Sequence, residues 1–268
     1  TLVNATMGTF ASANADGVSD MAVWNGYLYI ATQETNLAEI VRYGGGTTFT
    51  QVSGTDGQID GVASVTVDSV VLAVYEGRLF AGMRTAGSAA RVAVYEGVGT
   101  TWTASTTTAG TIGAETSVDD ITSLTVWNGS LYAATGETDL ANIYRWQVAG
   151  NTTSTTATNW IKVNNASGKA ISADTANIDG FVLRAYNGRL YAGSQTNATA
   201  GTTNTGAVYE LDASTFSWSL LNGTRGTFGA DTNVNNVTSL IEFNRVLYVG
   251  TDDSTNGVGA VYRYTKTG

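Results

Sequence analysis

The sequence predicts an all-β fold built from a repeated unit, and two observations lead to that prediction. The composition favours strands and turns, because the chain has 43 Thr and 32 Gly but no proline; threonine is frequent in strands and glycine in tight turns. In addition, one ten-residue segment recurs five times along the 268 residues. Self-similarity at a fixed spacing predicts one supersecondary unit copied along the chain.

Each copy of the segment has the chemistry of a β-hairpin. The copies are VWNGYLYIAT (23–32), VYEGRLFAGM (74–83), VWNGSLYAAT (126–135), AYNGRLYAGS (185–194) and EFNRVLYVGT (242–251). An aromatic residue precedes a mostly Asn-Gly turn, and Leu follows it, usually with Tyr next. Asn-Gly adopts positive φ at both turn positions at low cost, as a two-residue type I′ turn requires. We therefore predict two antiparallel strands around each turn.

Two further strands are predicted in each unit. A third strand matches EIVRYG (39–44), RVAVYEG (91–97), NIYRWQV (142–148), AVYELD (207–212) and AVYRYT (260–265). A fourth matches TFTQV (48–52), TWTAS (101–105), NWIKV (159–163) and FSWSL (216–220), and the fifth copy has none after its third strand. The unit is thus a four-stranded antiparallel meander followed by a glycine-rich linker.

A four-stranded meander repeated at this period is typical of a β-propeller blade. The pattern resembles the five-bladed β-propellers with N-G-x-L-Y-x-G-T and G-A-x-V-Y-R-Y repeats that occur in uncharacterised bacterial, archaeal and phage surface proteins. The resemblance covers essentially the whole chain and implies a fold rather than a ligand. It implies one domain over residues 1–268, with blades at about 15–54, 64–106, 118–164, 177–222 and 234–268 plus 1–7.

The N-terminus repeats a segment found near the other end of the chain. TLVNATMGTF (1–10) and SLLNGTRGTF (219–228) share six identical residues, and 219–228 begins at the end of the fourth strand of unit four. Because the fifth unit lacks its own fourth strand, we predict that residues 1–7 supply it. Pairing the two chain ends in one sheet would close the ring and cover an exposed edge.

Missing residue types narrow the chemistry. Without His or Cys, the chain has no imidazole base, thiolate nucleophile or disulfide. A net charge of −9 argues against a nucleic-acid partner, and no apolar run is long enough to predict membrane insertion. We expect no cofactor and no metal; the calcium-loop-like stretch 252–257 has Arg263 where an EF-hand needs Glu.

Candidate ligand residues stand where the first strand of each unit begins. They lie about eight residues before each hairpin turn, and a propeller would place them around one channel mouth: Asp16, Asp68, Asp120, Asp179 and Asn236. They could bind a cation or polyol, or act as the acid and base of glycoside hydrolysis. Alternatively, they form turns by accepting backbone N–H groups, which explains why the residue recurs in nearly every unit.

We interpret the chain as a non-catalytic extracellular, cell-surface or virion-surface propeller for adhesion, glycan binding or structural decoration. Its expected partners are glycans or neighbouring protein subunits, because its loops are rich in Thr, Asn, Ser and Gly. The alternative is a secreted carbohydrate-active enzyme using carboxylates such as Asp68, Asp120 and Asp179. Most tryptophans recur in register and are expected in the core; Trp146, whose counterparts are Tyr, is the better surface candidate.

Overall fold

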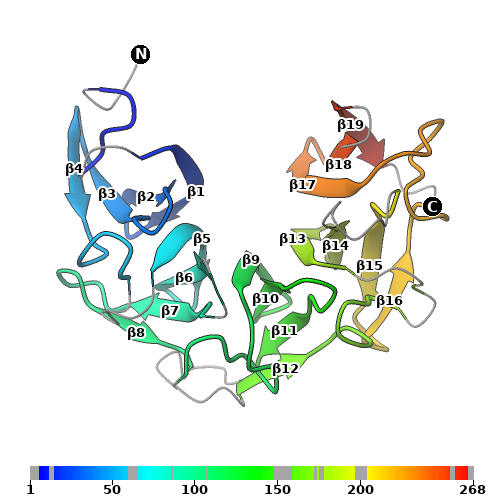
Figure 1. The fold of residues 1–268 in the computed structure, drawn as a ribbon, viewed down its shortest axis with the longest axis horizontal. Helices are drawn as coiled ribbons and strands as arrows, with labels where there is room; N and C mark the ends of the chain where they lie inside the picture. Colours follow the sequence, from blue (N-terminus) through cyan, green and yellow to red (C-terminus); the bar gives the residue numbers. More distant parts are fainter. Residues whose placement is uncertain are drawn as a thin grey trace. The chain divides into compact units, whose positions relative to one another are not determined.

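The computed structural model is all-β over the residues that it describes, which are 6–11, 15–59, 66–85, 87, 89–106, 108–147, 159–171, 174, 178–196, 204–253 and 257–264. Its elements are β-strands in antiparallel sheets (Figure 1), and the described residues contain no helix. Within those residues, accordingly, there is no helical segment long and apolar enough to cross a membrane.

The strands follow the predicted repeat. The first repeat contains β1 (Gly17–Trp24), β2 (Tyr27–Gln33), β3 (Ile40–Gly45) and β4 (Thr48–Gln51); the second contains β5 (Val67–Tyr75), β6 (Arg78–Thr85), β7 (Val92–Tyr95) and β8 (Trp102–Ala104). The third contains β9 (Asp120–Trp127), β10 (Ser130–Gly136), β11 (Ile143–Trp146) and β12 (Trp160–Lys162); the fourth contains β13 (Gly180–Tyr186), β14 (Arg189–Gln195), β15 (Val208–Asp212) and β16 (Ser217–Leu220). The fifth contains β17 (Asn236–Phe243), β18 (Val246–Asp253) and β19 (Val258–Tyr264).

The hairpin turns have the predicted geometry. Asn25 and Gly26 have φ of 48° and 77°, and Trp24 pairs directly with Tyr27 across them. The last hairpin keeps this conformation without glycine, because Asn244 and Arg245 have φ of 50° and 61°. Positive φ at both central residues matches the twist of the flanking strands. The turn prediction is therefore confirmed.

The chain forms two compact units, and the division between them falls within the third repeat. One unit contains Thr1–Val126 and Trp146–Ile161, and the other contains Trp127–Arg145 and Lys162–Gly268. The first has a core of aliphatic and aromatic side chains that includes Trp24, Val70 and Leu79. The second has two such clusters, one around Trp127 and Phe181 and one around Val237 and Leu247.

Aromatic residues at the hairpins and outer strands join neighbouring repeats. The indole of Trp24 donates to the carbonyl of Gly77 in the next turn (2.7 Å), and that of Trp127 donates to Gly188 (3.0 Å). On the outer strands, Trp102 donates to Val52 (2.7 Å). Buried indoles need such a partner, so the recurrence of these residues reflects packing between repeats.

Trp146 is buried rather than at the surface, which corrects the expectation drawn from its tyrosine counterparts. Only 2% of it is exposed, and its ring meets Trp160 edge-on at 4.9 Å. Tyr95 and Trp102 make the corresponding contact in the second repeat, with ring centroids 4.9 Å apart. At this position an aromatic side chain of the third strand packs against one of the fourth strand, and either Tyr or Trp can make the contact.

The linkers are fixed by the same backbone hydrogen bonds at each junction. A linker glycine donates to the residue two positions before the third strand of its repeat. A residue at the start of the next repeat, either in its first strand or two positions before it, donates back to that glycine. The glycine donors and their acceptors are Gly57 to Ala38, Gly110 to Ala90, Gly168 to Ala141 and Gly226 to Gly206. The return donors are Val67, Val118, Ile178 and Val234. Backbone hydrogen bonds therefore hold each of these junctions between repeats in the same way.

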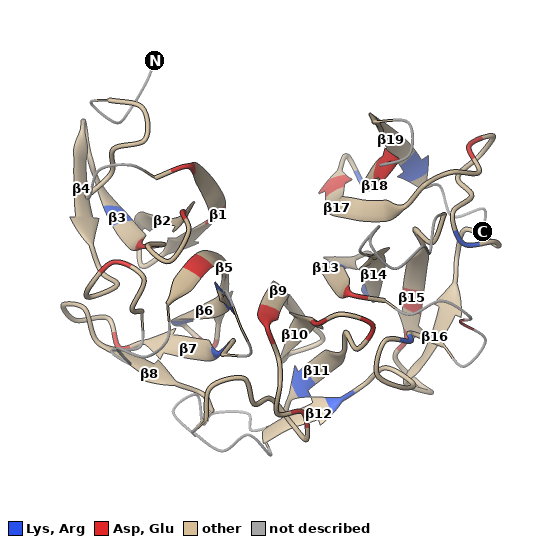
Figure 2. Cartoon of the chain, viewed as in Figure 1, with Lys and Arg blue, Asp and Glu red and all other residues tan. Residues whose placement is uncertain are grey.

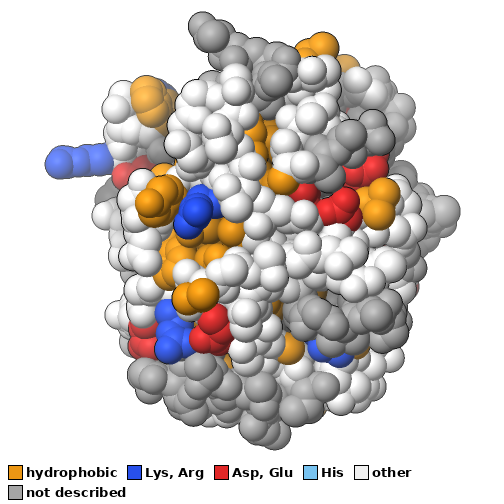
Figure 3. Space-filling view, turned by 90° about the vertical axis from the view of Figure 1, so that its left-hand side faces the viewer, with side chains coloured by type: hydrophobic (Ala, Val, Ile, Leu, Met, Phe, Trp, Pro, Cys, Tyr) orange, Lys and Arg blue, Asp and Glu red, His pale blue; other side chains and the backbone are white. Residues whose placement is uncertain are grey.

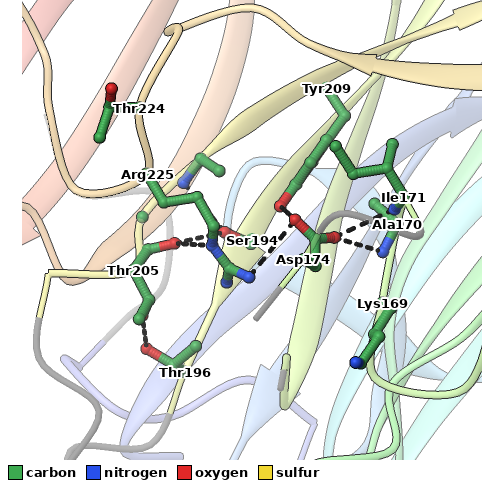
Figure 4. Close-up of polar contacts among 12 residues, drawn as sticks. Lys169, Ala170, Ile171, Asp174, Ser194, Thr196, Thr205, Tyr209, Thr224 and Arg225 are labelled. Carbon is green, nitrogen blue, oxygen red and sulfur yellow. Dashed lines mark hydrogen bonds and ion pairs between the residues drawn. The ribbon is translucent and has the colours of Figure 1, made fainter. Parts of the chain in front are cut away.

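A buried polar cluster pins the linker of the second unit (Figure 4). Oδ1 of Asp174 accepts from the hydroxyl of Tyr209 (2.9 Å) and lies 3.5 Å from Nη1 of Arg225. Its Oδ2 accepts from the backbone N–H groups of Ala170 (2.9 Å) and Ile171 (3.0 Å). Burial raises the pKa of Tyr209. Because both carboxylate oxygens are engaged in these contacts, the cluster serves structure.

The last repeat ends on an exposed strand. In β19, Val261 is 73% exposed, whereas Val208, at the same position of β15, is 4% exposed. β15 pairs with a fourth strand, β16, and β19 pairs with β18. The predicted N-terminal strand rests mainly on residues 1–5, which lie outside the described part of the chain.

Candidate functional site

The five candidate residues stand at the beginning of the first strand of each repeat, as the sequence predicted. Asp68, Asp120 and Asn236 lie within the first two residues of β5, β9 and β17, while Asp16 and Asp179 immediately precede β1 and β13. Figure 2 shows acidic residues in red on β5 and β9.

Three of these side chains hold a loop of the preceding repeat. Oδ1 of Asp68 accepts from the backbone N–H of Asn36 (2.6 Å), and Oδ1 of Asp179 accepts from that of Asp139 (2.6 Å). Asn236 accepts in the same way from Thr196 (2.6 Å). Each donor follows the second strand of its repeat. A carboxylate that accepts a backbone N–H makes a strong, charge-assisted bond, so these residues are clamps between repeats.

The first unit brings three of the candidates together. A polar cavity of about 210 Å³ is lined by Asp16, Gln33, Thr35, Asp68, Ser69 and Arg84. Asp120 adjoins it through an ion pair, with its Oδ2 3.3 Å from Nε of Arg84. Asp16 keeps its place because its backbone N–H donates to Gln33 (3.0 Å). The lining therefore supplies two carboxylates, an amide, two hydroxyls and a guanidinium.

Asp120 has an unusual protonation equilibrium. Burial raises its pKa to about 6; Arg84 opposes the rise, while the negative charges of Asp119 and Asp68 add to it. The side chain of Asp120 is 18% exposed, and that of Arg84 is 60% exposed. Desolvation thus outweighs the ion pair. Near pH 6 a much larger fraction of this carboxyl is therefore protonated than of an ordinary aspartate.

The neighbourhood of the cavity is acidic. The pKa of Glu34 is raised by desolvation and then by the negative charges of Asp16 and Asp56. Over the ranges that the structure describes, however, there is no set of three or more acidic groups placed to hold a metal ion. The arrangement is suited to hydrogen bonding with a neutral or partly cationic polar ligand.

Asp179 and Asn236 belong to the second unit and are engaged there. Besides its side-chain bond, Asp179 accepts through its carbonyl from the backbone N–H of Glu137 (2.9 Å). The side-chain amide of Asn236 donates to Oδ1 of Asp252 (3.0 Å). Both residues contribute to loop structure through more than one atom.

Sequence reasoning missed four lining residues: Gln33, Thr35, Ser69 and Arg84. A signal was available for one of them. One residue follows directly after each copy of the ten-residue segment. In the five repeats, in order, this residue is Gln33, Arg84, Gly136, Gln195 and Asp252, so Arg84 is the single cation at this position. Since β6 places Arg84 directly opposite Asp120, the cation marks a junction that has an ion pair at this position.

Comparisons with known proteins support the propeller fold. A scan against protein-family models found no match, and a search of curated proteins found none either. Similar solved structures include the extracellular domain of a putative hybrid two component system from B. thetaiotaomicron, with a TM-score of 0.57 and 12% identity over 97% of this chain. An exo-β-1,3-galactanase from Clostridium thermocellum has a TM-score of 0.53 and 14% identity over 100%.

A third similar structure is an α-L-arabinofuranosidase from Clostridium thermocellum, with a TM-score of 0.51 and 13% identity over 95% of this chain. The chain spans 28%, 63% and 91% of these three proteins, respectively. The solved neighbours are of the β-propeller type. At this level of identity the likeness concerns the fold, so the chain is an all-β protein of propeller type.

Proposed function

We propose that this protein is a non-catalytic extracellular, cell-surface or virion-surface propeller that binds glycans or neighbouring subunits. The observation that carries the proposal is the polar cavity of the first unit, whose lining includes Asp16, Gln33, Ser69 and Arg84. Alternating donors and acceptors of this kind suit the hydroxyl groups of a saccharide. Charged side chains occupy only small areas of the face drawn in Figure 3, in keeping with a neutral partner.

The non-catalytic assignment follows from what the carboxylates already do. Asp68 and Asp179 each bind a loop N–H at 2.6 Å. A carboxylate oxygen that already accepts a loop N–H is poorly placed to accept and return a proton during turnover. An extracellular domain, a galactanase and an arabinofuranosidase are among the similar structures, which favours a carbohydrate partner and an extracellular location.

One observation favours a second candidate function, that of a secreted carbohydrate-active enzyme. Asp120 has a pKa of about 6, which is suited to a general acid, and Asp68 is close enough to raise that pKa by its charge. Glycoside hydrolysis needs two carboxyl groups, usually about 5 to 10 Å apart, of which one is protonated. The sequence also named Asp179 for this alternative, and that residue belongs to the second unit.

Two assays distinguish the candidates. On a glycan array, the wild type should bind, and Arg84→Ala should lose the signal because a lining donor is removed. With p-nitrophenyl glycosides, the binding module should give no turnover. Turnover that disappears in Asp120→Asn would establish the enzyme instead. If no glycan binds and mass photometry shows only monomers without a partner, both versions of the binding proposal fail.

We further propose that the repeats form five blades, at the boundaries predicted above, and that residues 1–7 close the ring as the fourth strand of the last one. The proposal rests on the likeness of 1–10 to 219–228 and on the exposed β19. In the fourth repeat, the backbone N–H of Leu221 donates to Val208 (2.8 Å), and Val208 donates to Oδ1 of Asn222 (3.2 Å). In the alignment of 1–10 with 219–228, Val3 corresponds to Leu221 and Asn4 corresponds to Asn222.

A further inference from the structure

Phe216 occupies a backbone conformation that is unfavourable for its side chain. It ends the turn between β15 and β16 with φ of 50°, and its backbone N–H donates to Asp212 (2.9 Å). Asp212 also accepts from the backbone of Ser214 (2.7 Å), which fixes the turn. Left-handed φ is common for Gly and Asn but is an outlier for a bulky residue. Such outliers cluster at ligand sites.

The ring of Phe216 is displayed rather than buried. It is 41% exposed, and the guanidinium of Arg145 lies 4.8 Å from its centroid. Arg42 and Tyr27 form the same type of pair at 4.8 Å in the first repeat, but Tyr27 has no strained backbone. The cation therefore does not by itself account for an aromatic residue in the strained position.

A cavity adjoins the ring within the second unit. It has a volume of about 240 Å³, and its lining includes Phe216, Ser217, Trp218, Asn164 and Asn165. The walls are held in place: the indole of Trp218 donates to Val163 (2.9 Å), and Oδ1 of Asn164 accepts from Ile143 (2.9 Å). The site is therefore preformed, and its lining contains no charged side chain.

We propose that Phe216 and this cavity bind one neutral sugar residue of a glycan. The C–H face of a pyranose is apolar and stacks on an exposed aromatic ring, while its hydroxyls suit the amide of Asn165 and the hydroxyl of Ser217. The volume is below the range of about 300 to 1,000 Å³ of typical ligand pockets, which limits the occupant to about one sugar unit.

This proposal rests on glycan binding as the proposed function but assigns a second site, which uses different residues from the cavity containing Arg84. A structural role and a ligand-binding role for Phe216 make opposite predictions about the stability of variants at this position. If the ring only packed on Arg145, its removal would destabilise the fold. If it is kept for a ligand, Phe216→Asn should leave the melting temperature unchanged or raise it, because Asn tolerates left-handed φ.

The test uses methyl glycosides of glucose, galactose and N-acetylglucosamine as probes, with saturation-transfer NMR and titration of the Arg145 Nε–Hε resonance. We expect at least one probe to shift that resonance, and Phe216→Asn to weaken binding of that probe about tenfold or more. The matched control is Tyr27→Ser, which removes the other arginine-stacked aromatic and takes the residue found at the same position of the third repeat. It should bind as the wild type does.

Each remaining outcome decides the matter. Unchanged binding in Phe216→Asn overturns the proposal, as does a shift of the Arg145 resonance by a protein or peptide but by no sugar. If Phe216→Asn does not fold, Asn165→Ala and Ser217→Ala take its place and must both weaken binding. Binding that is lost only in Arg84→Ala leaves the proposed function standing and removes this site. Absence of binding by every glycan removes both.

Discussion

The linker glycine Gly168 offers the sharpest test of how the repeats are joined, and Gly188, in the turn between β13 and β14, is its control. Gly168 has φ of 69°, and a Cβ at this position would lie 1.9 Å from the carbonyl oxygen of Asp139. That oxygen belongs to a loop that Asp179 holds through a 2.6 Å bond, so it cannot easily move away. Gly188 has φ of 73° but has no atom within 4 Å of its Cβ position. The pair therefore separates backbone strain from collision.

The two alanine variants should differ about two- to threefold in their effect on the free energy of unfolding. Left-handed φ costs an L-residue roughly 1–2 kcal/mol, and this is the whole effect expected for Gly188→Ala. Gly168→Ala must also displace backbone that donates to Ala141 and accepts from Ile178, both at 2.9 Å. At roughly 1 kcal/mol for each bond, the total is about 3–4 kcal/mol.

Thermal unfolding followed by circular dichroism measures the difference. At about 2–4 °C per kcal/mol for a chain of this size, Gly188→Ala should lower the melting temperature by roughly 2–8 °C and Gly168→Ala by roughly 6–16 °C. Chemical unfolding in guanidinium chloride provides an independent free energy. Equal losses in the two variants would refute the reasoning, because the clash with Asp139 would then contribute nothing.

Three further perturbations test the clamps, the ion pair and the ring closure. Burial raises the pKa of Asp120 to about 6, so the folded state loses stability as the pH rises from 3.8 to 6 and this carboxyl ionises. Asp120→Asn should therefore raise the melting temperature at pH 7.5. It should also reduce the decrease in melting temperature between pH 3.8 and pH 6. Asp179→Ala should speed hydrogen exchange of the Asp139 amide by about tenfold or more, whereas Asp179→Asn, which keeps the acceptor, should not. Deletion of residues 1–7 should lower the melting temperature by many degrees, and unchanged stability would exclude their proposed role as a strand.

The strands and hairpins were predictable because their determinants are local. Asn25 and Gly26 specify a turn through their own φ preferences, and the alternation around them sets which side chains face the core. Repetition then allowed each prediction to be checked against four others. Even Asn244 and Arg245 followed, although Arg245 is not a usual turn residue, because the flanking strands impose the same twist.

The tight linkers and the position of Trp146 were not predictable, because their determinants are not local. Gly168 looks like any turn glycine until the loop around Asp139 is seen against it. Trp146 looks exceptional by residue type, yet it fills a position defined by the neighbouring Trp160. In both cases the constraint comes from a segment more than ten residues away, which composition and spacing do not reveal.

In the candidate site, a structural role and the proposed binding role fall on the same residue. Asp68 uses Oδ1 to hold the loop at Asn36 (2.6 Å) and also lines the polar cavity. A ligand in that cavity would therefore contact groups whose orientation the junction between repeats has already fixed, so little conformational entropy would be lost on binding. The same arrangement links binding to folding, because a ligand that binds only the folded junction stabilises it. The recurrence of Asp or Asn at this position in other repeats then reflects its hydrogen bond to the loop of the preceding repeat. The Arg84–Asp120 ion pair is what distinguishes the cavity chemically.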